Sequence, residues 1–174
     1  MRSILSFLIS FLIVAPSWGQ MYDPVKWSFN VDVVNENEVD LVIRADIEEG
    51  WYVYSQDAGD GPISTSFAFF DNDKVEVIGS VTEGEAIEDY DPNFEATLRF
   101  FKSEADFTQR IKLLTQDTTL IKGEFEFMVC NKGMCLPPEW VDIAVVLPAA
   151  QVAAEESKGF TSTASEQGIW SIFL

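Results

Sequence analysis

Apolar and polar residues alternate along two segments near the start of the chain, Trp27–Val34 and Val39–Ile47. A period of two places every second side chain on the same face of an extended strand, so each segment predicts a β-strand with one buried face. Seven further apolar runs of strand length follow, at Trp51–Tyr54, Ser64–Phe70, Val75–Val81, Ala96–Lys102, Asp106–Leu114, Gly123–Val129 and Val141–Leu147. No segment keeps a helical period over three turns, and the pattern therefore predicts an all-β protein.

Turn-forming residues separate these runs. The clearest turn signals are Asn35–Asn37, Glu48–Gly50, Gly59–Pro62, Asp71–Asp73 and Gln116–Asp117. Eight or nine short strands, with turn residues about every 8 to 12 positions, are typical of a β-sandwich. We find no internal repeat, and the length is that of one domain with a substantial core.

The first nineteen residues have the pattern of a secretion signal. Arg2 provides a positive start, residues 4–14 form an apolar run broken only by two serines, and Ser17 and Gly19 are small residues at the expected cleavage site. The apolar run is shorter than the roughly 20 residues that span a bilayer. We interpret residues 1–19 as a signal peptide rather than a buried helix, and expect an exported domain over residues 20–148.

The composition changes after Pro148. Residues 149–167 are rich in alanine, glutamate, serine and threonine, as in a flexible linker. Residues 168–174 are apolar again and include Trp170, a residue type that is frequent at membrane interfaces. This last stretch is either a docking tail or the start of a truncated membrane segment.

Charge and residue usage narrow the chemistry. The chain has 29 acidic and 11 basic residues, a net charge of −18, and no histidine. Removing residues 1–19 takes away Arg2 and no acid, which leaves a net charge of −19. This charge disfavours nucleic acid as a partner, and the acids, densest over residues 83–91, are interpreted as a solvated face. Without histidine, Ser-His-Asp and Cys-His catalysis and the common zinc sites are excluded.

The only two cysteines are Cys130 and Cys135, with Gly133 between them to permit a tight turn. In an oxidising compartment the pair is either a structural staple or a working redox couple. Closing so short a loop removes only about 2 kcal/mol of unfolded-chain entropy, against about 4 to 5 kcal/mol for a loop of a hundred residues. The small gain favours a disulfide that opens and closes.

Two alternatives use the same residues differently. A binding or adhesion sandwich would keep an inert disulfide, which resists mild reductants. A copper-handling domain would use the soft ligands Met128, Cys130, Met134 and Cys135 for Cu(I). Methionine at such positions is more often a packing residue, and two thiolates without histidine make a sparse metal site.

Several separate segments together resemble one protein family. They are Glu49–Ser55, Gly61–Phe67, Tyr90–Glu95, Phe107–Gln109 and Val129–Glu139. The block Cys130–Pro138, which reads Cys-x4-Cys-Leu-Pro-Pro, is the most specific of them. With these motifs the chain resembles the N-terminal periplasmic domain of the thiol:disulfide interchange protein DsbD, over residues 25–146. The resemblance implies an immunoglobulin-like sandwich and a linker that leads to a membrane domain.

The resemblance also implies a function as an electron relay, a protein-disulfide reductase domain in the periplasm. A thioredoxin-like donor domain would reduce the cysteine pair, which would then reduce periplasmic disulfide isomerases and cytochrome c maturation proteins. Cys135 would form the mixed disulfides and Cys130 would resolve them, with no other cofactor and no metal. Phe94 would cap the pair, although an aromatic residue in a sandwich is commonly part of the core.

Tyr52 and Tyr54 match the two tyrosines that flank the pair in the family. The two residues lie on one face of their predicted strand, together with Gly50 and beside a turn. This chain has four residues between its cysteines, whereas some members of the family have five, so the geometry of the loop is expected to differ.

Overall fold

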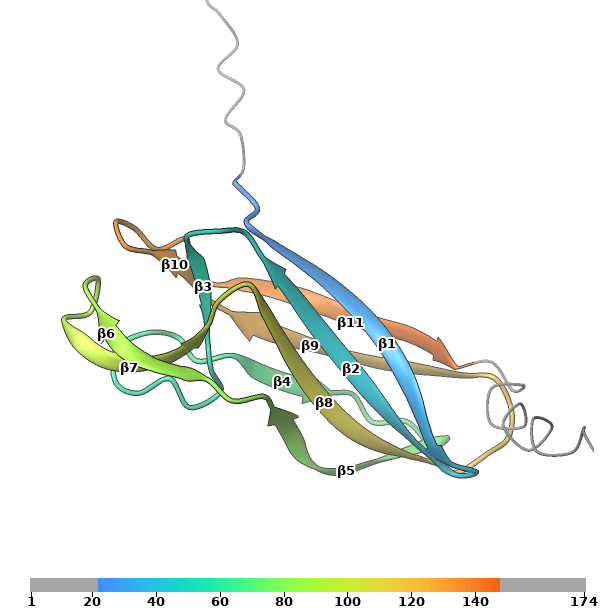
Figure 1. Ribbon diagram of the computed structural model, residues 1–174. Coiled ribbons are helices and arrows are strands. Elements are labelled where there is room, and N and C mark those ends of the chain that lie inside the picture. The colour runs from blue at the N-terminus through green and yellow to red at the C-terminus, as the bar shows by residue number, and fades with distance from the viewer. Residues whose placement is uncertain (1–21, 148–174) are drawn as a thin grey trace, which may run out of the picture.

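The computed structural model describes residues 22–147, and every regular element in this range is a β-strand (Figure 1). The strands are β1 (Val25–Asn35), β2 (Glu38–Ile47), β3 (Trp51–Tyr54), β4 (Ser66–Phe69), β5 (Val75–Glu83), β6 (Ile87–Asp91), β7 (Ala96–Phe101), β8 (Glu104–Leu113), β9 (Thr119–Phe127), β10 (Val129–Asn131) and β11 (Glu139–Leu147). The predicted all-β class is confirmed. The predictions for residues 1–19, 149–167 and 168–174 lie outside the described range.

The strands form three antiparallel sheets. Their orders are β1-β2-β8-β5, β11-β9-β4 and β10-β3-β7-β6. The first two sheets contain the long strands and lie against each other, whereas the third lies at one end of the molecule (Figure 1). Within residues 22–147 no helix is long and apolar enough to cross a membrane.

Aromatic side chains join the two long sheets. The ring of Trp27 on β1 lies 4.5 Å from the ring of Phe125 on β9 and 6.2 Å from that of Phe107 on β8. Phe107 and Phe125 are fully buried. Because each buried aromatic ring removes a large apolar area from water, these contacts make the region between the sheets the main hydrophobic core.

The alternation along β2 has the predicted consequence. Leu41, Ile43 and Ala45 are fully buried, whereas Arg44 between them points outward and forms an ion pair with Asp106 of the neighbouring β8. The period of two thus separates a core face from a charged face, as expected for a strand with one solvated side.

Strand β3 differs from the others because both of its faces are buried. Trp51 and Val53 belong to the main core, whereas Tyr52 and Tyr54 belong to a second, smaller apolar cluster. Cys130 of β10 lies in the same second cluster. The third sheet therefore separates the sandwich core from a separate cluster that surrounds one of the cysteines.

The structure has two strands that the sequence pattern did not predict, β6 and β10. Strand β6 forms the edge of its sheet with Ile87 and Tyr90 exposed, so it lacks an apolar alternation. Strand β10 is only three residues long, and Met128 separates it from β9. The acidic stretch on β6 is solvated at Glu88 and Asp89, but the prediction is wrong for Asp91, which is 1% exposed.

Candidate active site around the Cys130–Cys135 disulfide

The two cysteines face each other across a small hairpin and form a disulfide. Backbone hydrogen bonds flank the pair, from Asn131 N to Met134 O at 2.9 Å and from Leu136 N to Val129 O at 3.0 Å. The cysteines therefore occupy the non-hydrogen-bonded position between two bonded pairs, where opposite Cα atoms approach most closely. The Cα–Cα distance is 4.0 Å.

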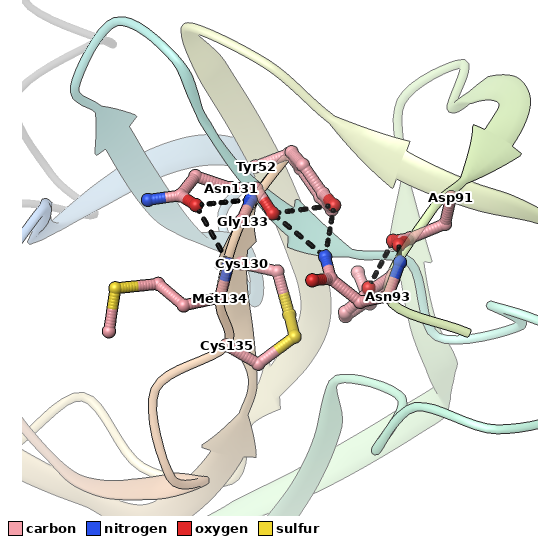
Figure 2. The surroundings of a disulfide bond; sticks show 9 residues. Tyr52, Asp91, Asn93, Cys130, Asn131, Gly133, Met134 and Cys135 are labelled. Carbon is pink, nitrogen blue, oxygen red and sulfur yellow. Dashed lines mark hydrogen bonds between the residues drawn. A yellow bond between two sulfur atoms is a disulfide. The ribbon is translucent and has the colours of Figure 1, made fainter. Parts of the chain in front are cut away.

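The side chain of Asn131 stabilises the turn of this hairpin. Its Oδ1 accepts hydrogen bonds from Gly133 N at 2.8 Å and Met134 N at 3.0 Å (Figure 2). Asparagine commonly holds a turn in this way, by accepting from backbone amides that follow it. Gly133 does not adopt a positive φ angle. The prediction that the turn depends on the conformational freedom of Gly133 is therefore wrong.

The two sulfur-bearing residues differ in accessibility. Cys130 is 0% exposed, whereas Cys135 is half-buried and lies at the edge of the second cluster. In thiol–disulfide exchange the outcome depends on which sulfur the incoming thiolate can reach. Cys135 is therefore the more accessible of the two cysteines.

Tyr52 and Tyr54 lie beside the pair on β3. Tyr52 is the register partner of Cys130, and its ring lies 4.6 Å from the ring of Phe100. The rings of Tyr52 and Tyr54 meet edge to face at 5.7 Å. The tyrosines thus form one wall of the cluster that buries Cys130.

The last residue of β6 and the residues that follow this strand bring polar groups to the same place. Asp91 accepts a hydrogen bond from the Tyr54 hydroxyl and another from Asn93 N at 2.8 Å. Asn93 Nδ2 donates to the carbonyl of Asn131 at 2.8 Å and to the hydroxyl of Tyr52 at 3.0 Å (Figure 2). Sequence reasoning did not identify Asp91, Asn93 or Asn131 as site residues. The only local signal was Asp91-Pro92-Asn93, a turn-forming sequence next to a candidate cap.

Phe94 follows directly and packs against the second cluster, as Cys135 does. Its ring meets that of Tyr54 edge to face at 6.0 Å. On another side it lies over Gly61, where an added Cβ would stand 2.8 Å from Phe94 Cδ1. Gly61 also has a φ angle of +126°, which favours glycine. The Phe94 ring therefore packs directly on the backbone of Gly61, and this packing position is called its seat below.

Burial and the Asp91 carboxylate keep both tyrosines neutral. Burial, followed by the nearby carboxylate, raises the pKa of Tyr52 to about 12. The same two causes, burial first, raise the pKa of Tyr54 well above its ordinary range. Both hydroxyl groups therefore keep their protons, and remain hydrogen-bond donors, above the pH at which an exposed tyrosine ionises.

This pKa shift predicts a specific alkaline titration. The Tyr52 pKa is raised above the unfolded value of 10.0, so the folded state holds its proton longer. Stability from this group is present below pH 10 and is lost as the pH rises toward 12. Ultraviolet titration of tyrosinate should show one transition near pH 12 that is absent from Tyr52→Phe. If the wild type instead shows one more tyrosine than Tyr52→Phe titrating near pH 10, Tyr52 is not perturbed.

A surface cleft of about 970 Å³ continues from the hairpin. Tyr52 and Lys132 line it, together with Trp51, Phe100 and Lys102. Lys102 Nζ lies 5.0 Å from the centre of the Phe100 ring.

Of the soft ligands of the copper alternative, Met128 packs on the same cluster as the cysteines but Met134 does not. The side chain of Met134 is exposed and points away from the disulfide (Figure 2). Over residues 22–147 no group of three or more histidine, cysteine, aspartate or glutamate side chains is arranged to hold a metal ion.

Fold and site together define a class of domain, an all-β sandwich with a small disulfide hairpin enclosed by aromatic residues at one end. The family model "Thiol:disulfide interchange protein DsbD, N-terminal" matches residues 20–147, so the chain belongs to this family. The resemblance seen in the sequence is confirmed, and with it the immunoglobulin-like fold that membership of this family implies.

Solved structures of similar domains have low sequence identity to this chain. The reduced N-terminal domain of DsbD from Neisseria meningitidis is 17% identical, with a TM-score of 0.47 over 70% of this chain and 86% of that chain. The N-terminal periplasmic domain of ScsB from Proteus mirabilis is 13% identical, with a TM-score of 0.54 over 79% of this chain and 53% of that chain.

A third similar structure is a complex between the DsbD and PilB N-terminal domains of Neisseria meningitidis. Its matched chain is 18% identical, with a TM-score of 0.42 over 68% of this chain and 80% of that chain. At these identities, the likeness to the ScsB domain supports a shared fold alone. Among curated proteins, none matches this sequence.

Proposed function

We propose that this chain is a periplasmic thiol–disulfide exchange domain that relays electrons through Cys130 and Cys135. A thioredoxin-like domain would supply the electrons, and oxidised periplasmic proteins would receive them. Disulfide isomerases and cytochrome c maturation proteins are the recipients that the family resemblance suggests. Membership of a thiol:disulfide interchange family supports the chemistry. The observation that carries the proposal is the asymmetry between the fully buried Cys130 and the accessible Cys135.

Reduction of the pair proceeds in two exchanges. A donor thiolate attacks Cys135 Sγ, the bond to Cys130 breaks, and Cys130 leaves as a thiolate that takes a proton from water. The second donor thiol, as its thiolate, then attacks the donor sulfur of the mixed disulfide and releases Cys135, which is protonated in turn. The pair gains two electrons and two protons, and the donor becomes oxidised.

Delivery reverses these roles. The Cys135 thiolate attacks a disulfide of the recipient, and one recipient sulfur leaves as a thiolate. Cys130 then attacks Cys135 Sγ in the mixed disulfide, which restores the intramolecular bond and releases the reduced recipient. Burial of Cys130 next to Cys135 suits this second step because the resolving thiol is already within the ring of six residues.

Phe94, Tyr52 and Tyr54 would shape the access to this chemistry. We propose Phe94 as a cap, because it packs on the cluster that contains the disulfide and has a seat on Gly61. The tyrosines would flank the cap and the pair, since Tyr54 contacts the Phe94 ring and Tyr52 lies beside Cys130. A cap of this kind would restrict small thiols while a docked protein could still reach Cys135.

The redox equilibrium of the pair tests the proposal. The domain is equilibrated with a dithiothreitol or glutathione series, and free thiols are counted by alkylation and mass spectrometry. We expect a midpoint of about −200 to −250 mV, within reach of thioredoxin-like donors. A pair that stays oxidised well below about −300 mV is a structural staple. That result would contradict the relay and favour a binding sandwich.

A further inference from the structure

We infer that Asn93 is a positioning residue that holds the Phe94 loop closed over the disulfide and so limits access to Cys135. This inference rests on the proposed function only for its biological meaning. The mechanical role of Asn93 follows from its contacts. Its side chain joins the loop after β6 to the hairpin that carries both cysteines.

The amide nitrogen of Asn93 donates to two neighbouring acceptors. Nδ2 donates to Asn131 O at 2.8 Å and to the Tyr52 hydroxyl at 3.0 Å. The same Asn131 carbonyl also accepts from the Tyr52 hydroxyl at 3.2 Å. A carbonyl oxygen has two lone pairs, so these donors fill its capacity. Three segments, the loop, β3 and the hairpin, therefore meet at one oxygen atom next to Cys130.

The neighbours of Asn93 in the loop make the position of Phe94 depend on the hydrogen bonds of the Asn93 side chain. On the N-terminal side of Phe94, Asn93 N donates a hydrogen bond to the buried carboxylate of Asp91. The same carboxylate accepts a hydrogen bond from the Tyr54 hydroxyl. On the other side, Glu95 has a φ angle of 54°, an unfavourable conformation for a residue with a side chain. Phe94 lies between the amide contact and this strained residue. Loss of the amide contact would allow the strain to relax by moving Phe94 off its seat.

The experiment measures how fast a small reductant reaches the disulfide. Tris(carboxyethyl)phosphine cleaves disulfides irreversibly, so its rate reports access to sulfur rather than the reduction potential of the pair. We expect Asn93→Ala to be reduced about tenfold faster than the wild type, as loss of two hydrogen bonds from a closed loop would allow. The Asn93→Asp side chain has the same shape as asparagine, but its carboxylate cannot donate a hydrogen bond. The disulfide of this variant should be reduced at least as fast as that of Asn93→Ala.

Asn72 provides a matched control at the opposite end of the sandwich. Its Nδ2 also donates to a backbone carbonyl, that of Leu120 at 2.8 Å, and its Oδ1 accepts from Lys74 N at 2.9 Å. Asn72→Ala should destabilise the protein comparably and leave the reduction rate within about twofold of the wild type. Equal acceleration by Asn72→Ala, or wild-type rates in both Asn93 variants, would overturn the inference.

The result remains interpretable if the relay function fails. A pair with a very low potential would still be cleaved by the phosphine, and the ratio of the variant rate to the wild-type rate would still measure loop opening. A normal midpoint with no acceleration in the Asn93 variants would instead reject the role of Asn93 and leave the relay intact.

Discussion

The Cys130→Ser variant, in which Cys135 is the free thiol, is expected to react with a disulfide reagent about 100-fold faster than Cys135→Ser. The reason is burial, since Cys130 is fully enclosed by the second cluster and Cys135 is only half-buried. A reagent reaches Cys130 only after local opening, and 100-fold corresponds to an opening free energy of about 3 kcal/mol. The measurement is the rate of reaction with dithionitrobenzoate under native conditions.

The same variants separate the two roles in exchange with a protein. A mixed disulfide formed through Cys135 persists in Cys130→Ser when the partner also lacks its second cysteine, because neither protein then has a thiol to resolve it. The partner is a thioredoxin-like protein with a single cysteine, activated as a mixed disulfide with thionitrobenzoate, which leaves when Cys135 attacks. Non-reducing electrophoresis should then show a persistent covalent complex for Cys130→Ser only. In concentrated guanidinium chloride the two thiols should react at similar rates, which controls for intrinsic reactivity. Equal native rates would contradict the assignment of Cys135 as the attacked sulfur.

Replacement of Gly123 by alanine is expected to cost about 3 kcal/mol of unfolding free energy. Gly123 lies on β9, between Phe69 of β4 and Ile143 of β11 in the register of the sheet. An added Cβ would stand 2.5 Å from the carbonyl oxygen of Ala68 and 3.2 Å from Phe69 Cα. These are backbone atoms, so relief requires β4 to shift away from β9. Urea denaturation measures the loss, and the m-value reports whether unfolding remains cooperative.

Gly133→Ala is the matched control for this substitution. A Cβ there would contact only Asn131 Oδ1, at an ordinary 3.6 Å, and Gly133 has no positive φ angle. Its effect should remain within about 0.5 kcal/mol, as for most surface changes. If Gly123→Ala proves as stable as the wild type, the close approach of β4 and β9 is wrong. A large loss in Gly133→Ala would restore the predicted dependence of the turn on glycine.

Strands with one solvated face were predictable because apolar and polar residues alternate along them with a period of two. Strand β2 alternates buried and outward residues along its length, and its predicted extent agrees with the structure to within one residue at its start. Strand β6 was missed because its side chains are exposed on an edge, where acidic residues also discourage pairing with another chain. Strand β10 was missed because three residues are too few to display a period.

The polar part of the site was not predictable for a different reason. Asn93 and Asn131 are 38 residues apart in the sequence, and Tyr54 and Asp91 are 37 apart. Neither contact has a local pattern, since an asparagine in a turn usually serves its own backbone. Only the meeting of β3, the loop after β6 and the hairpin brings these groups together.

The sequence by itself determined the all-β class, the cysteine pair with its family, and the exclusion of histidine chemistry. These follow from local periodicity, from a specific motif and from composition, none of which needs distant contacts. The tertiary structure decided that Cys130 is buried while Cys135 is accessible, and that Asp91 is enclosed. It also decided that Asn93 closes onto the hairpin. Burial and long-range hydrogen bonds depend on which segments pack together, and that packing is a property of the whole fold.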